Sequence, residues 1–281
     1  MTCKKAIIPI AGYGTRRLPI TKAIEKCMLP VGNRPVIDYI VEDCIRAGIT
    51  EFLFVVGEEF DQIRRYYGQN QLLEEYLENK GKKKELKMVR DLDRKARFHY
   101  VVQDQYQPYG TTVPIWLCRH LIKKDEKFLV VFGDQFFYRP DGSSELADFI
   151  KQAGKSGTPS AMLANEVNWN DVSHYGIVVT KRQNGRELYE KIIEKPSREE
   201  APTNLSNASC FVLDSAVFPF IEDNMEQEFE GEHFVTDALN SYSEAGNDMA
   251  VIRAKGEFLD CGTTEAWLHT NQRILGNAEG K

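Results

Sequence analysis

The feature that constrains the fold most is the alternation of strand-length hydrophobic runs with amphipathic stretches in the first half of the chain. We expect strands at Ala6–Pro9, Phe52–Val56, Phe98–Val102 and Phe128–Phe132. Between the first two, residues Val36–Arg46 carry apolar side chains at helical spacing, and a glycine two positions further on suits a helix end. Strands and helices in this order build βαβ units, so the sequence predicts an α/β fold around a mixed, mainly parallel sheet with flanking helices.

The strand spacing shortens after Asp141, where turn signals such as "QNGR" separate the apolar runs. This pattern indicates a smaller, partly antiparallel lobe on the same sheet. The expected strands are Ala161–Val167, Tyr175–Thr180, Leu188–Glu194 and Ser209–Leu213, and the expected helices are Phe234–Glu244 and Glu265–Leu275.

The chain from Asp61 to Asp93 is heavily charged and contains most of the string "NKGKKKELKMVRDLDRK". Its lysines could attract phosphates. A solvated helix face with a loop is the interpretation we favour, because charge runs in globular proteins usually lie on such faces.

Composition excludes several classes of protein. Lys and Arg number 36 and Asp and Glu 42, a net charge of −6, so no general attraction for nucleic acid is expected and any anion site must be built locally. No run approaches 18 apolar residues and the N-terminus lacks signal-peptide features, which favours a cytoplasmic protein without a membrane segment. No C-x-x-C pair suggests zinc, and we expect free thiols at Cys3, Cys27, Cys44, Cys118, Cys210 and Cys261.

A glycine turn follows the first expected strand, in "AGYGTRRLPITKAIEKCMLP". Gly12 and Gly14 let backbone N–H groups approach phosphate oxygens, and Arg16 and Lys26 add two cations. A dinucleotide fingerprint would need a third glycine where Arg17 stands, and the Walker A signature is absent. A backbone cradle with two cations suits a triphosphate. A strand-to-helix turn with surface cations would, however, have a similar sequence.

Two carboxylates follow apolar runs, Asp134 in "LVVFGD" and Asp260 in "FLDCG". The carboxyl ends of strands are where α/β sheets place ligands, and two such carboxylates could hold one Mg²⁺. Taken alone, either residue could merely start a turn.

The combination of "AGYGTR" with "K-x-MLP" resembles the sugar-phosphate nucleotidylyltransferases, and the longer strings are most similar to the bacterial UTP:glucose-1-phosphate uridylyltransferases. The strings "HYGIVV", "IIEKPSREEAPTNL", "TDAL" and "DCGTTEAWL" follow in the family's order, so the resemblance covers nearly the whole chain. It implies a Rossmann-like sheet in a single domain. Residues 1 to about 140 would bind the nucleotide, about 141–260 the sugar phosphate, and 261–281 would form a C-terminal helix.

The resemblance also implies roles for individual residues. Catalytic roles fall to Arg16, Lys26, Asp134 and Lys195, and Mg²⁺ would be bound by Asp134 and Asp260. The nucleotide would be bound by Ala11, Gly12, Gly14, Thr15, Arg16, Lys26, Gln103 and Gly110, with Gln103 on the uracil ring. The sugar phosphate would be bound by Tyr175, Gly176, Glu194, Lys195 and Glu232.

Some of these residues have simpler readings without the resemblance. Gln103 would be interpreted as an exposed polar residue at a strand end, and Glu194 and Lys195 would be interpreted as a surface pair. Adjacent side chains on a strand face opposite ways unless the strand ends there, as Pro196 suggests.

The chain departs from the family's pattern near the nucleotide. Cys27 replaces an acidic residue and would be either a low-pKa thiol or, as we favour, a passively packed one. Pro108, Thr111 and Thr112 replace Gly, His and Ala in the base-binding loop, and Pro108 cannot donate an N–H.

Further departures lie near the sugar. Ser209 stands where the family has a glycine, Phe234 where it has a glutamine, and Gln135 where relatives often have a second acid. Added bulk could change which sugar fits.

We therefore expect uridylyl transfer from UTP to a sugar-1-phosphate, in first place glucose-1-phosphate, with Mg²⁺ as cofactor and a homo-oligomeric state, dimer or tetramer. The alternatives are the same reaction with dTTP, CTP or another sugar phosphate, and a non-catalytic protein that binds nucleotide sugars.

Overall fold

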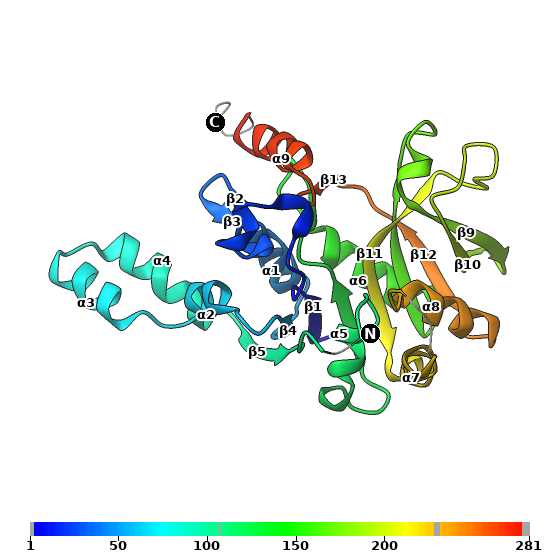
Figure 1. The fold of residues 1–281 in the computed structure, drawn as a ribbon, viewed down its shortest axis with the longest axis horizontal. Helices are drawn as coiled ribbons and strands as arrows, with labels where there is room; N and C mark the ends of the chain where they lie inside the picture. Colours follow the sequence, from blue (N-terminus) through cyan, green and yellow to red (C-terminus); the bar gives the residue numbers. More distant parts are fainter. Residues whose placement is uncertain (1–2, 107, 228–230, 277–281) are drawn as a thin grey trace.

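The computed structural model describes residues 3–106, 108–227 and 231–276, and these build one central sheet with helices on both faces (Figure 1). The strands of this sheet are β1 (Lys5–Pro9), β4 (Glu51–Val56), β5 (Arg97–Val102), β6 (Lys127–Val131), β8 (Ser160–Glu166), β9 (Gly176–Gln183), β10 (Arg186–Glu194), β11 (Leu205–Asp214) and β12 (Met249–Arg253). Two short antiparallel ribbons accompany it, β2 (Pro30–Val31) with β3 (Arg34–Pro35), and β7 (Gln135–Tyr138) with β13 (Glu257–Asp260).

The nine strands lie in the order β5–β4–β1–β6–β11–β8–β12–β10–β9. The first four run parallel, as the βαβ pattern predicted. Beyond β6 the pairing is antiparallel except between β8 and β12. The mixed sheet is confirmed, but its mainly parallel character holds only for the N-terminal part, because β9, β10 and β11 run antiparallel to the strands beside them.

Helices cover the two faces as separate groups. They are α1 (Val36–Arg46), α2 (Asp61–Tyr67), α3 (Gln71–Asn79), α4 (Lys83–Arg94), α5 (Val113–Leu117), α6 (Glu145–Ser156), α7 (Phe218–Glu226), α8 (Val235–Glu244) and α9 (Thr264–Gly276). One face carries α1 and α6, and the other carries α5, α7 and α8. The predicted helix Val36–Arg46 has the observed bounds, and the other predicted elements differ by a few residues at their ends. Of the C-terminal stretch predicted as a helix, residues 277–281 lie outside the described part.

Side chains along the central strands point alternately to the two faces of the sheet, and this alternation explains the two hydrophobic cores. In β1, Ala6 and Ile8 pack under α1, whereas Ile7 points to the opposite core with Leu53 and Val55 of β4. Each strand is therefore hydrophobic on both faces, which is what a sheet covered on both sides requires.

The charged segment forms an arm that projects from the body (Figure 1). It comprises α2, α3 and α4, and Arg90 of α4 binds the carboxylate of Glu74 in α3 at 2.7 Å. The interpretation as solvated helix faces is confirmed, since Leu86 is the buried residue of α4.

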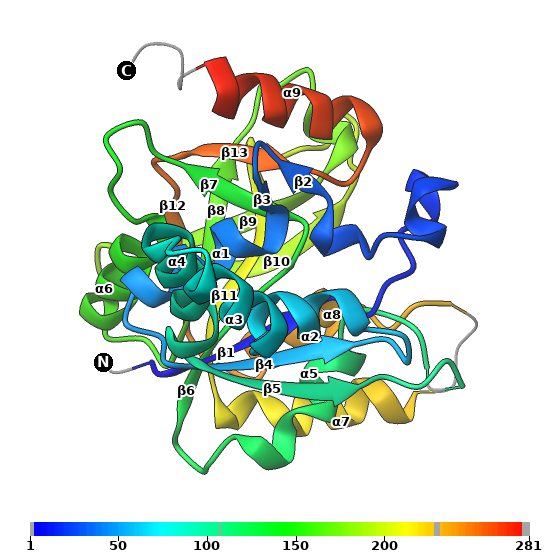
Figure 2. The same cartoon turned by 90° about the vertical axis from the view of Figure 1, so that its left-hand side faces the viewer.

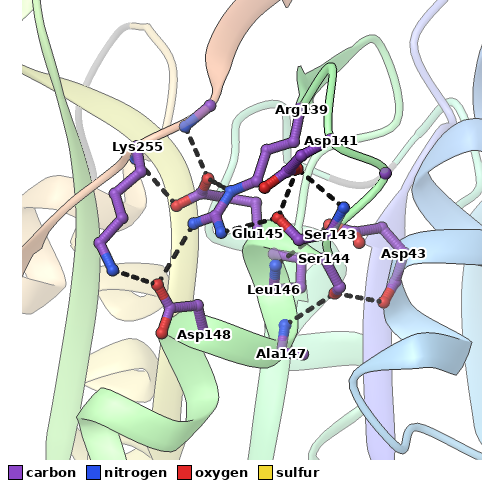
Figure 3. Close-up of polar contacts among 12 residues, drawn as sticks. Asp43, Arg139, Asp141, Ser143, Ser144, Glu145, Leu146, Ala147, Asp148 and Lys255 are labelled. Carbon is purple, nitrogen blue, oxygen red and sulfur yellow. Dashed lines mark hydrogen bonds and ion pairs between the residues drawn. The ribbon is translucent and has the colours of Figure 1, made fainter.

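The ribbon of β7 and β13 is held by a buried carboxylate, Glu145 at the start of α6 (Figure 3). Arg139 donates to its Oε2 atom at 2.6 Å, and the backbone N–H groups of Lys255 and Gly256 donate to its two oxygens at 3.1 and 2.7 Å. Lys255 also binds Asp148, one helical turn further on. These contacts fix the turn that leads into β13 and so set its register against β7.

Helix α9 lies over this ribbon (Figure 2). Its Trp267 donates from Nε1 to the carbonyl oxygen of Pro30 at 2.7 Å, which links the C-terminal helix to the β2–β3 ribbon. None of the helices in the described ranges is long and apolar enough to cross a bilayer.

Candidate active site

The chain leaves the middle of the sheet at β1 and enters the glycine turn. The N–H of Ile10 still bonds to Val55 at 2.8 Å, so the turn starts at a fixed point beside β4. Gly14 has φ +64°, a left-handed conformation in which glycine avoids strain, and a Cβ there would lie 3.2 Å from Cβ of Lys26. A Cβ at Gly12 would meet only open space, so its backbone is accessible to a ligand. Thr15 begins the single 3₁₀ turn Thr15–Arg17 that follows.

The two predicted cations lie on the same side of this turn. Lys26 is packed against Gly14 and forms an ion pair with Asp134, in which both side chains are partly buried. Arg16 is exposed, and its guanidinium lies beside Gly262, two residues after Asp260. The cations are therefore brought to the two carboxylates that sequence analysis placed in a metal site.

The carboxylates themselves are brought together by the β7–β13 ribbon. Asp260 pairs with Gln135 across this ribbon, and Asp134 directly precedes Gln135. The N–H of Cys261 donates to the carbonyl oxygen of Asp134 at 2.9 Å. Residues 125 to 127 positions apart along the chain thus meet at one point. The position of each residue after an apolar run could not establish this meeting.

Electrostatics at this point favour a bound cation. Burial raises the pKa of Asp260, and the charge of Asp134 raises it further, while the N–H of Gly262 and the charges of Lys26 and Arg16 oppose the rise. In the described part of the chain no cluster of three or more metal-binding side chains exists, so a metal ion held here would take at most two carboxylates from the described residues. Two carboxylates suit a divalent cation that takes its other ligands from phosphate oxygens and water.

A cavity of about 400 Å³ opens beside this cluster, at the carboxyl ends of β1, β4, β5 and β6. The predicted site residues in its wall are Ala11, Gly12, Arg16, Lys26, Gln103, Gly110, Asp134 and Glu232. Most of the residues assigned to the nucleotide therefore share one cavity, and Glu232, assigned to the sugar phosphate, shares it with them.

The far wall of the cavity is made by two segments that pair with each other. Gly110 has φ +136°, and a Cβ there would lie 2.3 Å from the carbonyl oxygen of His233. The N–H of Thr112 donates to that oxygen at 2.9 Å, and the hydroxyl of Thr111 accepts from Val235 at 2.9 Å. This close approach brings Glu232 to the wall and explains why a glycine is needed at position 110.

The remaining sugar-phosphate residues lie together on β9 and β10, outside the cavity wall. Gly176 pairs with Glu194, and a Cβ at Gly176 would lie 2.9 Å from Oε1 of Glu194. Strand β10 ends at Glu194, and Lys195 adopts φ +45° while its N–H donates to Tyr175 at 3.0 Å. The expected strand end before Pro196 is thereby confirmed, and the strict alternation of side chains stops at Lys195.

This second group is electrostatically connected to the carboxylate pair. Burial raises the pKa of Tyr175, and the next contribution comes from the negative charge of Asp260. Burial also raises the pKa of Glu194, against the lowering effect of Lys195. Tyr175 is therefore close enough to Asp260 for the charge of that carboxylate to affect its pKa.

The positions that depart from the family's pattern have clear environments. Cys27 is buried and burial raises the pKa of its thiol far above the usual range, so the packed interpretation holds and the low-pKa alternative is wrong.

Ser209 lies in a bulge of β11 with φ +48°, a conformation that favours glycine. Gln135 donates to the carbonyl oxygen of Ala208 at 2.8 Å and so supports this bulge. Phe234 is exposed at the start of α8, and Pro108 is exposed in the loop after β5.

Among the residues that sequence analysis missed, Arg17 joins two parts of the site. It is 4% exposed, and its Nη1 atom donates to the carbonyl oxygens of Cys261 and Thr263, both at 3.0 Å. Its guanidinium also lies 5.1 Å from the ring centre of Trp267. The available signal was an arginine in place of a glycine next to Arg16, which does not reveal a partner at the other end of the chain.

Comparisons with known proteins agree with this geometry. The sequence pattern of the family described as "Nucleotidyl transferase" matches residues 5–277. The UTP–glucose-1-phosphate uridylyltransferase of Pseudomonas aeruginosa is 32% identical over 275 residues, which cover 98% of this chain and 96% of that protein.

Solved structures show the same similarity. An apo UDP-glucose pyrophosphorylase superposes with a TM-score of 0.88 at 29% identity, covering 99% of this chain and all of that one. A UDP-glucose pyrophosphorylase complexed with UDP-glucose superposes with a TM-score of 0.83, also at 29% identity, over 98% of this chain and 99% of that one.

Proposed function

Because this chain belongs to the nucleotidyl transferase family, we propose that it transfers the uridylyl group of UTP to glucose-1-phosphate, giving UDP-glucose and pyrophosphate. The observation that carries the proposal is the meeting of the glycine turn, Lys26 and Arg16 with Asp134 of the cavity wall and with Asp260, which lies next to Asp134 outside that wall. Cations and paired carboxylates beside an open backbone turn suit a triphosphate bound with a metal ion.

The reaction needs positioning more than acid–base chemistry. A phosphate oxygen of the sugar phosphate attacks the α-phosphorus of UTP in line, a new P–O bond forms, and the bond to pyrophosphate breaks. A phosphate monoester is already a competent nucleophile at neutral pH, so neither a general base nor a covalent intermediate is required. Alignment and neutralisation of charge provide the rate enhancement.

Each residue has a part in this alignment. The backbone at Gly12 and Gly14, with Thr15 and Arg16, binds the triphosphate, and Lys26 exchanges part of its ion pair with Asp134 for the phosphates. We assign Mg²⁺ to Asp134 and Asp260, where it would neutralise phosphate oxygens at the reacting phosphorus.

The other substrate groups are assigned by their places in the fold. Gln103 and Gly110 bind uracil, with Ala11 beside them in the same cavity wall. Lys195 holds the sugar phosphate, and Glu194, Tyr175 and Gly176 bind the sugar. Glu232 was expected on the sugar as well, and its place in the cavity wall gives it access to the nucleotide.

The division of the domain is part of the same proposal. Residues 1 to about 140 bind the nucleotide and about 141–260 bind the sugar phosphate, with the C-terminal helix behind the metal site. A cytoplasmic enzyme that assembles as a dimer or tetramer is also proposed, and light scattering of the purified protein tests the assembly.

The decisive experiment is a pyrophosphate-release assay with glucose-1-phosphate and a panel of UTP, dTTP and CTP. We expect UTP to give the highest kcat/KM, by a modest margin because Pro108 cannot offer an N–H to the base. A wild type that prefers CTP would contradict UTP as the nucleotide substrate, and a wild type that needs a different sugar phosphate would contradict glucose-1-phosphate. If no pair of nucleotide and sugar phosphate releases pyrophosphate, the result would point to a binding protein.

A further inference from the structure

Two tyrosines project at the cavity without protein packing to account for them. Tyr13 is 71% exposed and Tyr109 is 63% exposed, and both belong to the cavity wall. Tyr13 lies in the glycine turn after β1, whereas Tyr109 lies in the loop after β5. Large aromatic side chains gain their stability by burial, so rings left open at a ligand cavity are available to a ligand.

The backbone that carries each ring is fixed. The carbonyl oxygen of Tyr109 accepts from the N–H of His233 at 2.8 Å. Beside Tyr13, the carbonyl oxygen of Gly14 accepts from Arg17 at 2.8 Å and from the hydroxyl of Thr21 at 2.9 Å. The backbone beside both tyrosines is therefore held by hydrogen bonds, while the two side chains remain exposed.

Strand β4 lies between the strands that lead to these loops, and its end contributes Gly57 to the cavity wall. A Cβ at Gly57 would lie 3.5 Å from the carbonyl oxygen of Ala11, so Gly57 and Ala11 form adjoining parts of the cavity wall. Gln103, at the end of β5, lines the same cavity with hydrogen-bonding groups that can reach the edge of a base.

We propose that Tyr13 and Tyr109 stack on the nucleobase, and that they supply affinity for the base independently of its identity. This inference rests on the proposed function, since it assumes that the cavity binds a nucleoside triphosphate. Every base has a π-face, so stacking on aromatic rings tolerates any base, whereas hydrogen bonds from Gln103 distinguish one edge from another. The tyrosines thus set how tightly a nucleotide binds, and Gln103 sets which nucleotide is preferred.

The experiment measures binding by titration calorimetry of the full chain with UTP, CTP and inorganic tripolyphosphate. Tyr13→Ala and Tyr109→Ala should each raise the Kd for UTP and for CTP by the same factor, about fivefold to thirtyfold. Tyr13→Phe should bind like the wild type, because the ring is retained. Tripolyphosphate has no base, so its Kd should stay within about twofold in all variants if the glycine turn is intact.

Tyr106→Ala is the matched control. Tyr106 is 87% exposed in the same loop as Tyr109 but does not belong to the cavity wall, so its removal should leave every Kd unchanged. Gln103→Ala supplies the contrast, because it should alter the ratio of the Kd values for UTP and CTP.

The outcomes separate this inference from the proposed function. A wild type that turns over UTP while Tyr13→Ala and Tyr109→Ala bind it unchanged would overturn the stacking. Equal weakening of tripolyphosphate and UTP would also overturn it, since the tyrosines would then act on the turn. A wild type that neither binds nor turns over UTP would refute the proposed function itself.

Discussion

The Nη1 atom of Arg17 lies 3.0 Å from the carbonyl oxygen of Cys261, the residue that follows Asp260. A second hydrogen bond of the same length reaches Thr263, and the Nε atom of Arg17 is buried without a partner. A buried cation that satisfies two carbonyl oxygens holds the glycine turn after β1 and the segment that follows β13 as one unit. A buried polar atom without a partner lowers the stability of the fold. The Nε atom of Arg17 therefore offsets part of the stabilisation that the two hydrogen bonds provide.

Replacing this cation should loosen that unit. Arg17→Met keeps the length of the side chain but removes both hydrogen bonds, so we expect the free energy of unfolding to fall by about 1 to 3 kcal/mol. The Mg²⁺ concentration needed for half-maximal activity should rise, because the segment that carries Asp260 loses its anchor. Urea unfolding and a magnesium titration of pyrophosphate release measure the two effects.

Arg46→Met is the control for Arg17→Met. Arg46 also donates to a backbone carbonyl, that of Gly142 at 2.9 Å, but it is exposed and lies on α1 away from the cavity. It should change the unfolding free energy by less than about 0.5 kcal/mol and leave the magnesium dependence unaltered. An identical magnesium curve for Arg17→Met would contradict the role of Arg17.

The carboxylate pair should be essential for turnover and dispensable for folding. Asp134→Asn and Asp260→Asn keep the shape of each side chain but remove one charge, and we expect kcat to fall by at least about 10²- to 10³-fold. Both side chains are partly accessible, so unfolding free energies should stay within about 1 kcal/mol of the wild type. Asp223→Asn, at an exposed position of α7, should be silent in both assays. Near-normal activity of either variant at saturating Mg²⁺ would exclude that residue as a ligand.

Acid sensitivity should depend on Asp38, far from the cavity. Burial would raise the pKa of Asp38, but Lys95 and Arg34, at 2.6 and 2.8 Å, hold it below the ordinary value of 3.8. The ionised carboxylate therefore stabilises the fold at pH values above 3.8, and this stabilisation is lost as the pH falls through the lower folded-state pKa. Asp38→Asn should cost about 1 to 3 kcal/mol at neutral pH, with a smaller cost in acid.

Urea unfolding of both proteins between about pH 7 and about pH 2 tests this dependence. Asp61→Asn serves for comparison, because Asp61 pairs with Arg64 between two exposed side chains and should contribute less than about 1 kcal/mol. A constant difference between wild type and Asp38→Asn over the whole pH range would show that the ionised form is not what stabilises the fold.

The bulge in β11 should be relieved by a glycine. Ser209 has φ +48°, a conformation that costs a residue with a Cβ about 1 to 2 kcal/mol. Glycine avoids this strain, but the larger conformational entropy of the unfolded chain with glycine cancels part of the gain in stability. We expect Ser209→Gly to raise the unfolding free energy by about 0.5 to 1 kcal/mol. Ser206→Gly, in the regular part of the same strand, removes a hydrogen bond to Asn165 and should destabilise. Destabilisation by Ser209→Gly would mean that its hydroxyl contributes more than the backbone strain costs.

Local patterns predicted the parts of the structure that depend on near neighbours. Residues Val36–Arg46 have helical spacing and a glycine beyond their end, so the helix could be placed to the residue. Pairing between distant segments could not be predicted in this way. The ribbon that joins Asp134 to Asp260 consists of two four-residue strands, too short for a periodic signal, and its register depends on the buried Glu145.

The same limit applies to single side chains. Arg17 meets Cys261 across 244 positions of sequence, and nothing near either residue indicates the other. Glu232 reaches the cavity because Gly110 lets two backbones approach closely, a contact that no spacing of residues reveals. The resemblance to a family named most site residues, but only the folded chain shows which of them share the cavity.

The last prediction concerns Lys195, whose backbone breaks the alternation of β10. With φ +45° and its N–H on Tyr175, the residue is held at the strand end beside Glu194, where its charge can meet a phosphate. Lys195→Met removes that charge, and a charge-assisted hydrogen bond contributes about 1.5 to 3 kcal/mol, so the KM for glucose-1-phosphate should rise about 10- to 100-fold. Because the contact also aligns the nucleophile, kcat should fall as well.

The substitution of Lys195 should not affect the binding of the nucleotide. We expect the KM for UTP to move by less than about twofold, and Lys191→Met, at an exposed position of the same strand, to leave both constants unchanged. Lys195→Arg should restore part of the affinity, since it keeps the positive charge but alters the geometry of the contact. Initial rates with each substrate varied in turn decide the matter: if Lys195→Met weakens UTP and glucose-1-phosphate equally, Lys195 acts on the triphosphate, and its assignment to the sugar phosphate is wrong.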